Sequence, residues 1–252
     1  MGELEVRTIV TVSDLQVPYQ HKPAVRALSE FIRQWGPDDV ICVGDEIDMP
    51  QVSRWSKGLA GEYAGKLHKD RDETSRVLES LGVRHVMRSN HGTRLFDYLH
   101  RYAPALADEP ELQYARYMRF ADIGVEYHSE MWEFAPGWLL AHGDEGGLSN
   151  EAGRTALKLA QRAGKSVTCG HTHRAGVIPF TEAHGGKHVR TLFGMEVGCL
   201  MELKKANYLK SGGANWQLAF GIHFVDGRKV SPHVVFMRTD GSFVWEGREW
   251  KP

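Results

Sequence analysis

The stretch SVTCGHTHRAG, residues 166–176, joins an apolar run to His171 and His173, which stand two positions apart. An apolar run followed by a glycine indicates a buried strand that ends in a loop. Two imidazoles held side by side at such a place suit metal binding, provided that other segments supply further ligands. The alternative is that each is a hydrogen-bonded core histidine, which would account for one residue better than for a pair. Which interpretation holds depends on the rest of the chain.

Four other strand-like segments end in polar residues of the same kind. In chain order they place Asp14 and Gln16, Asp45 and Asp48, Asn90 and His91, and His142 after apolar runs. In α/β sheets the carboxyl ends of the strands form the crevice where ligands bind, so the five ends can converge. Carboxylate, amide and imidazole groups without thiolates are the ligands that a site for two divalent metal ions requires. Taken alone, any one of these residues could be a turn or capping residue.

Apolar periodicity predicts an α/β chain. Strands are expected over 6–14, 39–45, 83–91, 138–144 and 166–171, and helices over 22–36, 62–81, 93–103 and 150–163. From about residue 175 the pattern alternates, and Asp-Gly pairs at 226–227 and 240–241 predict hairpins. We interpret residues 1–252 as one domain with a β-rich part from about residue 175. The segment KSGGANW, 210–216, is expected to be a mobile loop.

Composition excludes several classes of protein. Hydrophobic residues make up 42% of the chain and charged residues 25%, with a formal net charge of −1. A chain without a basic field is not expected to bind long nucleic acid or an anionic membrane. There is no signal-peptide pattern, and no apolar run approaches the roughly 20 residues of a membrane span. Because the three cysteines lie in apolar stretches, we expect buried thiols in a cytoplasmic protein.

The polar segments resemble the motifs of the calcineurin-like metallophosphoesterases. That family carries, in order, Asp-x-His, Gly-Asp-x-x-Asp, Gly-Asn-His-(Asp/Glu), a single His and Gly-His-x-His. The matches here are Asp14, the segment 44–48, Asn90-His91, His142 and the segment 170–173. The resemblance covers residues 10 to about 175 and is closest to compact bacterial and phage-encoded members. It implies a four-layer αββα sandwich of two mixed β-sheets flanked by helices.

The resemblance also implies a role for each matching residue. One divalent metal ion would be bound by Asp14, Gln16, Asp45 and His173, and a second by Asp45, Asn90, His142 and His171. A hydroxide shared by the two ions, roughly 3.5–4 Å apart, would attack the phosphorus. His91 would protonate the leaving oxygen with Asp48 orienting it, and Arg88 and Arg94 would bind the phosphate. Manganese is the expected metal, with magnesium, iron and zinc as alternatives.

Three positions depart from the family pattern. Gln16 stands where the family usually has His, and a neutral amide oxygen is a weaker ligand that favours manganese or magnesium over zinc. Gly92 replaces the Asp or Glu after the motif histidine, and Met49 replaces an Arg of the protein phosphatases, which argues against a phosphoserine phosphatase. As alternatives, Gln16 could be a solvated loop residue, and Arg88 and Arg94 could pair with surface acids.

Some other polar residues are expected to lie at the surface without a role in the site. Asp144 and Glu145 could simply face the solvent, and the nine histidines outside the motifs are expected at the surface.

The resemblance implies a phosphodiesterase that hydrolyses small nucleotide esters, including 2′,3′-cyclic nucleotides. The alternatives are a single-strand nuclease or phosphomonoesterase of the same superfamily, and a non-catalytic interaction scaffold. The segment 49–63 contains Arg54, Trp55 and Lys57, which could hold a phosphate and stack on a base, although Trp55 could equally cover the domain edge. The segment 204–217 offers a similar combination. A small phosphodiester or nucleotide is therefore the expected partner, with single-stranded nucleic acid as the alternative.

Overall fold

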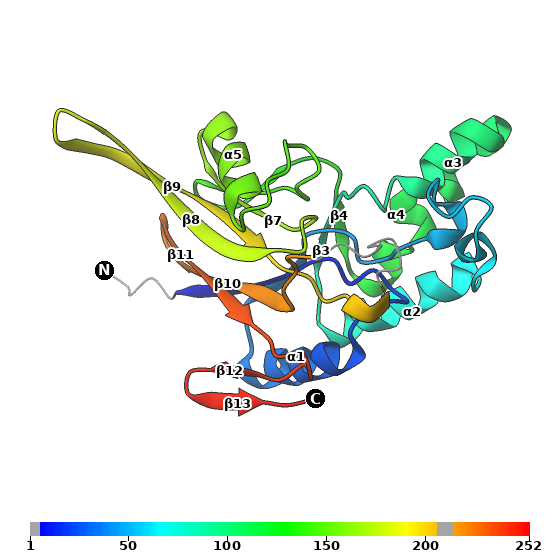
Figure 1. Cartoon of the computed structure of the whole chain (residues 1–252), viewed down its shortest axis with the longest axis horizontal. Coiled ribbons are helices and arrows are strands. Elements are labelled where there is room, and N and C mark those ends of the chain that lie inside the picture. The colour runs from blue at the N-terminus through cyan, green and yellow to red at the C-terminus, as the bar shows by residue number, and fades with distance from the viewer. Residues whose placement is uncertain (1–5, 206–213) are drawn as a thin grey trace.

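The computed structural model describes residues 6–205 and 214–252. Two mixed β-sheets lie face to face with helices on their outer sides, which confirms the expected αββα sandwich (Figure 1). The strand order is β11-β10-β1-β2-β3-β4 in the first sheet and β5-β6-β7-β9-β8 in the second. Both sheets contain strands from the part of the chain after residue 175.

The bounds of the elements are as follows. The first sheet contains β1 (Arg7–Val12), β2 (Asp39–Cys42), β3 (His85–Met87), β4 (Glu126–His128), β10 (Ala219–Asp226) and β11 (Lys229–Phe236). The second contains β5 (Trp132–Ala135), β6 (Trp138–Leu140), β7 (Ser166–Cys169), β8 (Ala175–His184) and β9 (Lys187–Val197). A separate hairpin is formed by β12 (Phe243–Trp245) and β13 (Arg248–Trp250). The helices are α1 (Lys22–Trp35), α2 (Leu67–Ser80), α3 (Arg94–Tyr102), α4 (Tyr114–Tyr117) and α5 (Arg154–Ala163).

Strand direction brings the polar loops to one edge of the molecule. β1, β2, β3 and β4 are parallel to one another, and β6, β7 and β9 are parallel in the second sheet. Parallel strands end at the same edge of a sheet, so the loops that follow β1, β2 and β3 open side by side. The loops after β6 and β7 do the same in the second sheet.

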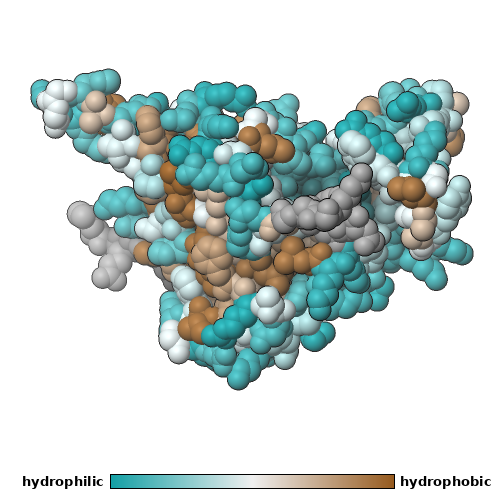
Figure 2. Space-filling view, viewed as in Figure 1, coloured by the Kyte–Doolittle hydropathy of each residue, from teal (hydrophilic) through white to brown (hydrophobic). Residues whose placement is uncertain are grey.

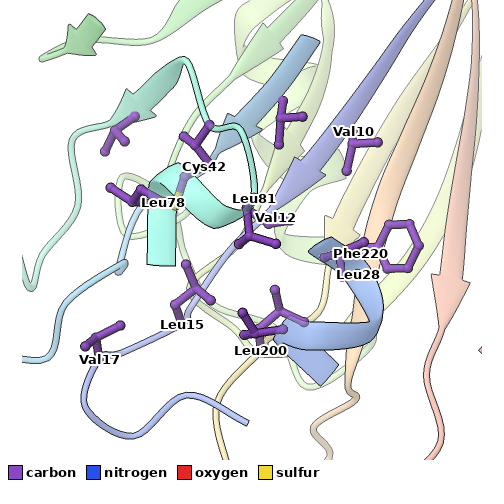
Figure 3. Close-up of a cluster of buried hydrophobic side chains, with 14 of the residues drawn as sticks. Val10, Val12, Leu15, Val17, Leu28, Cys42, Leu78, Leu81, Leu200 and Phe220 are labelled. Carbon is purple, nitrogen blue, oxygen red and sulfur yellow. The ribbon is translucent and has the colours of Figure 1, made fainter. Parts of the chain in front are cut away.

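Three hydrophobic clusters among the described residues correspond to the layers. Side chains of β1, β2, α1 and α2 meet on the outer face of the first sheet, among them Val10, Leu28 and Leu78 (Figure 3). A second cluster, which includes Ile9 and Met195, fills the space between the sheets. A third lies under α5. The outer surface is largely hydrophilic in the view of Figure 2, with hydrophobic colour gathered near the middle of that face.

The predicted helices and strands are confirmed with shortened ends. The hairpin predicted at Asp226-Gly227 joins β10 to β11, but the hairpin predicted at Asp240-Gly241 is wrong, because β11 does not pair with β12. Gly241 instead lies against the first turn of α1, where a Cβ would come within 2.5 Å of the Ala24 nitrogen. The second hairpin turns at Glu246-Gly247, between β12 and β13. Most of the predicted loop at 210–216 falls outside the described residues.

All three cysteines are buried and free, as expected. Within residues 6–205 and 214–252, none of the helices has the length and hydrophobicity needed to span a membrane.

The expectation that the nine other histidines lie at the surface is wrong for His21 and His223. His21 is buried and accepts a hydrogen bond from the Ala24 nitrogen at the start of α1. His223, on β10, lies between the sheets with its Nε2 2.9 Å from Thr168 Oγ1 of β7. Burial, and secondarily His233, lowers the pKa of His223 from its ordinary value near 6.5 to about 3.

This burial predicts acid-dependent stability. Between pH 6.5 and 3 the unfolded chain binds a proton at His223 that the folded chain does not, so folded-state stability present above pH 6.5 is lost as the pH falls. Urea unfolding should show that lowering the pH from about 6.5 to about 4.5 destabilises the unaltered protein by roughly 3 kcal/mol more than His223→Gln. His188→Gln, at an exposed position on β9, is the control. Parallel pH profiles for the protein and His223→Gln would contradict the assignment.

Candidate metal centre

Backbone hydrogen bonds tie the loops of the candidate centre together. The Asp14 nitrogen donates to the Gly44 oxygen over 3.1 Å, and the Gln16 nitrogen donates to the Asp45 oxygen over 2.8 Å. The His171 nitrogen donates to Asp14 Oδ2 over 2.9 Å, which joins the loop after β7 to the loop after β1. The loops of the two sheets therefore meet independently of any ligand.

The first group of predicted ligands surrounds His173. Its Nε2 lies 3.0 Å from Asp14 Oδ1 and 3.1 Å from Gln16 Nε2. Gln16 is only 2% exposed, so the alternative of a solvated loop glutamine is wrong. A rotation of the Gln16 amide by 180° would present Oε1 at the same place.

The second group surrounds His142. The ligand atoms of Asp45, His142 and His171 lie within 4.8 Å of one another, with His142 Nε2 3.3 Å from Asp45 Oδ2. His142 Nε2 is also 2.9 Å from Asn90 Oδ1. On its other side, His142 Nδ1 is 2.9 Å from the Val43 oxygen, which can only accept. Nδ1 therefore carries a proton, and Nε2 is the ring nitrogen that faces the cluster and could bind a metal ion.

The chemistry of these groups fits divalent cations. Two carboxylates, Asp14 and Asp45, are buried together, and Asp14 Oδ1 and Gln16 Oε1 make no aligned hydrogen bond within the described chain. Burial alone would lower the pKa of His142, but Asp45 and Asp14 outweigh it and raise the pKa to about 10. The carboxylates thus draw a proton onto an imidazole. A cation would replace that proton and take up the unsatisfied oxygens.

The backbone at this centre is unusual. Among the residues that the structure describes, eight non-glycine residues have positive φ, and five of them are the predicted ligands Asp14, Gln16, Asp45, His171 and His173. A left-handed conformation costs such residues about 1–2 kcal/mol each. Strain of this kind persists where the surrounding structure imposes it, and it concentrates at functional sites. The ligand set therefore coincides with the most strained part of the described backbone.

Sequence reasoning missed Glu196, which holds the loop of His171 and His173. Glu196 is fully buried on β9, and its carboxylate accepts hydrogen bonds from Thr172 Oγ1 over 2.6 Å and from the Thr155 nitrogen over 2.8 Å. It lies 24 residues beyond the loop that it supports, outside any motif. Only the pairing of β9 with β7 brings it there.

Glu46 and Tyr114 were also missed. Glu46 follows Asp45 and is fully buried, and Tyr114 donates a hydrogen bond to its carboxylate. Burial raises the pKa of Glu46 to about 7. The apolar setting of the segment GDEID was the one signal that this glutamate would be internal.

His91, Asp48 and Arg94 form a second cluster beside Asp45. The His91 nitrogen donates to Asp45 Oδ1 over 3.1 Å, and His91 Nδ1 lies 3.2 Å from Asp48 Oδ1, although not aligned for a hydrogen bond. Arg94 Nη2 is 2.7 Å from His91 Nε2, and Arg94 also donates to the Asp48 backbone oxygen. A guanidinium only donates, so Nε2 accepts and the ring proton lies on Nδ1, facing Asp48.

Arg88 lies next to the centre and is paired. Its Nη1 is 2.6 and 2.7 Å from the two carboxylate oxygens of Asp144. The expectation that Asp144 simply faces the solvent is therefore wrong. Glu145 is exposed, but its carboxylate accepts hydrogen bonds from the His142 and Gly143 nitrogens and so holds the loop of His142.

Comparison with solved structures supports the fold described above. The fold is that of the calcineurin-like metallophosphoesterases: Vps29 from Cryptosporidium parvum shares it with a TM-score of 0.51 and 14% identity, over 98% of this chain and 96% of that one. No family model matches the chain.

The chain belongs to the family of the mycobacteriophage gene 54 proteins. It is 39% identical to the Gene 54 protein of Mycobacterium phage D29 over 254 residues, which cover 97% of this chain and 99% of the relative. The Gene 54 protein of Mycobacterium phage L5 is 38% identical over 254 residues, with the same coverage.

The contacts of Gln16 predict how this residue affects the affinity for zinc. Gln16→His would add an imidazole beside His173 and Asp14, and imidazole is a better ligand for zinc than a neutral amide. We expect zinc to bind at least about tenfold tighter, or about 1.4 kcal/mol, in competition with a fluorescent chelator. Gln34→His, on the exposed side of α1, is the control. Equal zinc affinity in both variants would remove Gln16 from the ligand set.

Close packing around Gly170 gives a second test. A Cβ at this position would overlap Ser13 Oγ and lie 2.7 Å from Asp14 Oδ2. Gly170→Ala should therefore displace Asp14 and lower the bound metal per chain, measured by elemental analysis after dialysis against manganese, while circular dichroism reports the fold. Gly147→Ala, where a Cβ meets nothing within 4 Å, is the control. Full manganese content in a folded Gly170→Ala protein would mean that Asp14 is not a ligand.

Proposed function

We propose that the protein is a metal-dependent phosphodiesterase that hydrolyses small nucleotide esters. The observation that carries the proposal is a cleft of ≈ 660 Å³ that begins at Asn90 and is lined by cationic and aromatic side chains. Its volume is in the range of sites for small organic ligands. Arg88 and Arg94 line the end beside the candidate metal centre, and Trp55 and Tyr102 line it further away.

The aromatic end of the cleft is exposed and carries positive charge. Trp55 is 70% exposed and Tyr102 is 44% exposed, so Trp55 does not cover a domain edge. The Arg54 guanidinium lies 4.7 Å from the centre of the Trp55 ring, and Lys57 Nζ lies 4.1 Å from that of Tyr102. Exposed aromatic faces with adjacent cations suit a nucleobase attached to a phosphate.

The charge at the phosphate end favours a diester. Arg88 is already neutralised by Asp144, and Arg94 is paired with Asp48. A diester phosphate carries one negative charge, whereas a monoester carries close to two at neutral pH. Glu62, Asp97 and Asp144 also line the cleft, which interrupts any continuous basic track of the kind that single-stranded nucleic acid requires. A small diester therefore fits the lining better than a monoester or a long strand.

In this proposal, different residues bind the metal ions, bind the phosphate and transfer the proton. Bound divalent ions, held by the two ligand groups described above, would neutralise the phosphoryl oxygens and lower the pKa of the attacking water. Arg94 would donate its hydrogen bond to a phosphate oxygen instead of to His91 Nε2. His91 Nε2 would then be free to carry a proton to the leaving oxygen. Asp48 faces Nδ1 of the same ring and balances the resulting positive charge.

The role of His91 predicts a dependence on the leaving group. With manganese supplied, the protein should hydrolyse bis-p-nitrophenyl phosphate faster than p-nitrophenyl phosphate. His91→Ala should lower kcat by about 10²–10⁴ for a dinucleotide, whose alkoxide must be protonated, and by much less for the p-nitrophenyl diester, whose phenolate leaves unaided.

His184→Ala, in the β8–β9 hairpin, is the control for this experiment. Equal losses on both substrates would contradict the acid role of His91. Products from a long oligonucleotide would instead indicate a nuclease, and failure to cleave any ester would favour an interaction scaffold.

The cleft also predicts a binding role for Trp55. Trp55→Ala should raise KM for a nucleotide diester with little change in kcat, because stacking on one base contributes about 1–3 kcal/mol. Tyr63→Ala is the matched control, since Tyr63 is an exposed aromatic residue in the same segment that does not line the cleft. An unchanged KM in Trp55→Ala would place the base elsewhere.

A further inference from the structure

A second group of metal-ligating side chains lies away from the candidate metal centre. β3 and β4 are parallel neighbours, and their register pairs His85 with Glu126 and Met87 with His128. Residues two apart on a strand share a face, so His85, Glu126 and His128 lie together on one side of the sheet. β4 is the edge strand of that sheet. We propose that these three side chains bind one divalent cation of the zinc class.

The separations of the three side chains match a cation site. His85 Nδ1 is 3.1 Å from His128 Nε2 and 3.6 Å from Glu126 Oε2, and His128 Nε2 is 3.9 Å from Glu126 Oε1. One ligand atom from each residue lies within 4.8 Å of the others. Nitrogen and oxygen ligands about 2.0–2.2 Å from a tetrahedral zinc are separated from one another by roughly 3.3 Å. Small side-chain adjustments would thus place a cation at their centre.

Neighbouring side chains orient the imidazoles of His85 and His128 toward the proposed cation position. Asp39 Oδ2 lies 3.5 Å from His85 Nε2, the ring nitrogen that faces away from His128. A carboxylate behind a histidine in this way fixes the tautomer that leaves the other nitrogen free to bind metal. Trp132 of β5 stacks on His128 with ring centres 4.0 Å apart, and its ring lies tilted against that of His85 with centres 4.6 Å apart. Two rings are therefore held in place before any ion arrives.

Charge and protonation also suit a cation. Burial, opposed by Glu126 and reinforced by His85, lowers the pKa of His128, so its imidazole is neutral and its lone pair is free near pH 7. A hydrogen bond between the two imidazoles would also explain their 3.1 Å contact, but not why Glu126 approaches both. Glu126 is 67% exposed, so no packing forces it there. Its exposed side leaves a fourth position for water.

The position of this group gives the cation a structural role. The Arg88 nitrogen donates to the His128 oxygen over 2.7 Å, so the group adjoins the start of the loop that carries Arg88 and Asn90. Trp132 belongs to the edge strand of the second sheet. A cation here would fasten the three-residue strands β3 and β4 beneath one wall of the cleft.

Zinc stoichiometry tests the proposal without measuring hydrolysis. Equilibrium dialysis against zinc, followed by elemental analysis, should give one zinc per chain fewer for His128→Ala and for Glu126→Gln than for the unaltered protein. Glu126→Gln alters an exposed residue and keeps its size, so it guards against a loss caused by misfolding. His188→Ala, an exposed histidine on β9, should bind as much zinc as the unaltered protein.

The candidate metal centre must be separated from this group in the same experiment. A double variant, Asp45→Asn with His142→Ala, should lose zinc from the centre but retain one ion that disappears when Glu126→Gln is added. If Glu126→Gln and His128→Ala fold and bind as much zinc as the unaltered protein, the site does not exist. If the double variant binds no zinc, the proposal is likewise overturned, whatever the hydrolytic activity.

Discussion

Asp14 and Asp45 are buried carboxylates, and the rest of the centre must compensate their negative charge. An ionised carboxylate without compensation in such surroundings costs several kcal/mol. The nearest side chains that can carry a compensating positive charge are His173, 3.0 Å from Asp14, and His142, 3.3 Å from Asp45. An imidazole can neutralise a carboxylate only by holding a proton, and it then has no lone pair for a ligand. A divalent cation satisfies both kinds of group at once, which explains why carboxylates, amides and imidazoles are gathered here without a lysine or arginine among the predicted ligands.

The backbone places these groups before any cation binds. Asp14, Asp45 and His171 each adopt a left-handed conformation two or three residues after the end of a strand, which breaks the alternation of side-chain directions along that strand. Hydrogen bonds between the loops, such as that from the Gln16 nitrogen to the Asp45 oxygen, hold the turns in place. Glycines provide the space: a Cβ on Gly44 would lie 2.7 Å from His142 Nδ1. Left-handed backbone, hydrogen bonds between the loops and glycines without a Cβ therefore act together to position the same few ligand residues.

The sequence predicted what depends on local pattern and missed what depends on distant contacts. Asp45, Asn90 and His171 could be found because each is a polar residue within three positions of the end of an apolar strand. Glu196 could not, since its role comes from the packing of β9 beside β7 and not from its neighbours in the chain. His223 was expected at the surface because one polar residue in an alternating strand gives no sign that both faces are covered.

The helix α3 connects the candidate centre to the cleft. Arg94, at its first residue, contacts His91, and Tyr102, at its last residue, forms part of the aromatic end. A straight helix rises 1.5 Å per residue, so these two positions are about 12 Å apart along its axis. A free phosphate can reach only one end of that span, whereas a phosphate joined to a nucleoside can contact both. In the proposed function, the length of this short helix would couple recognition of the base to the geometry around His91, and it would favour esters large enough to engage both ends.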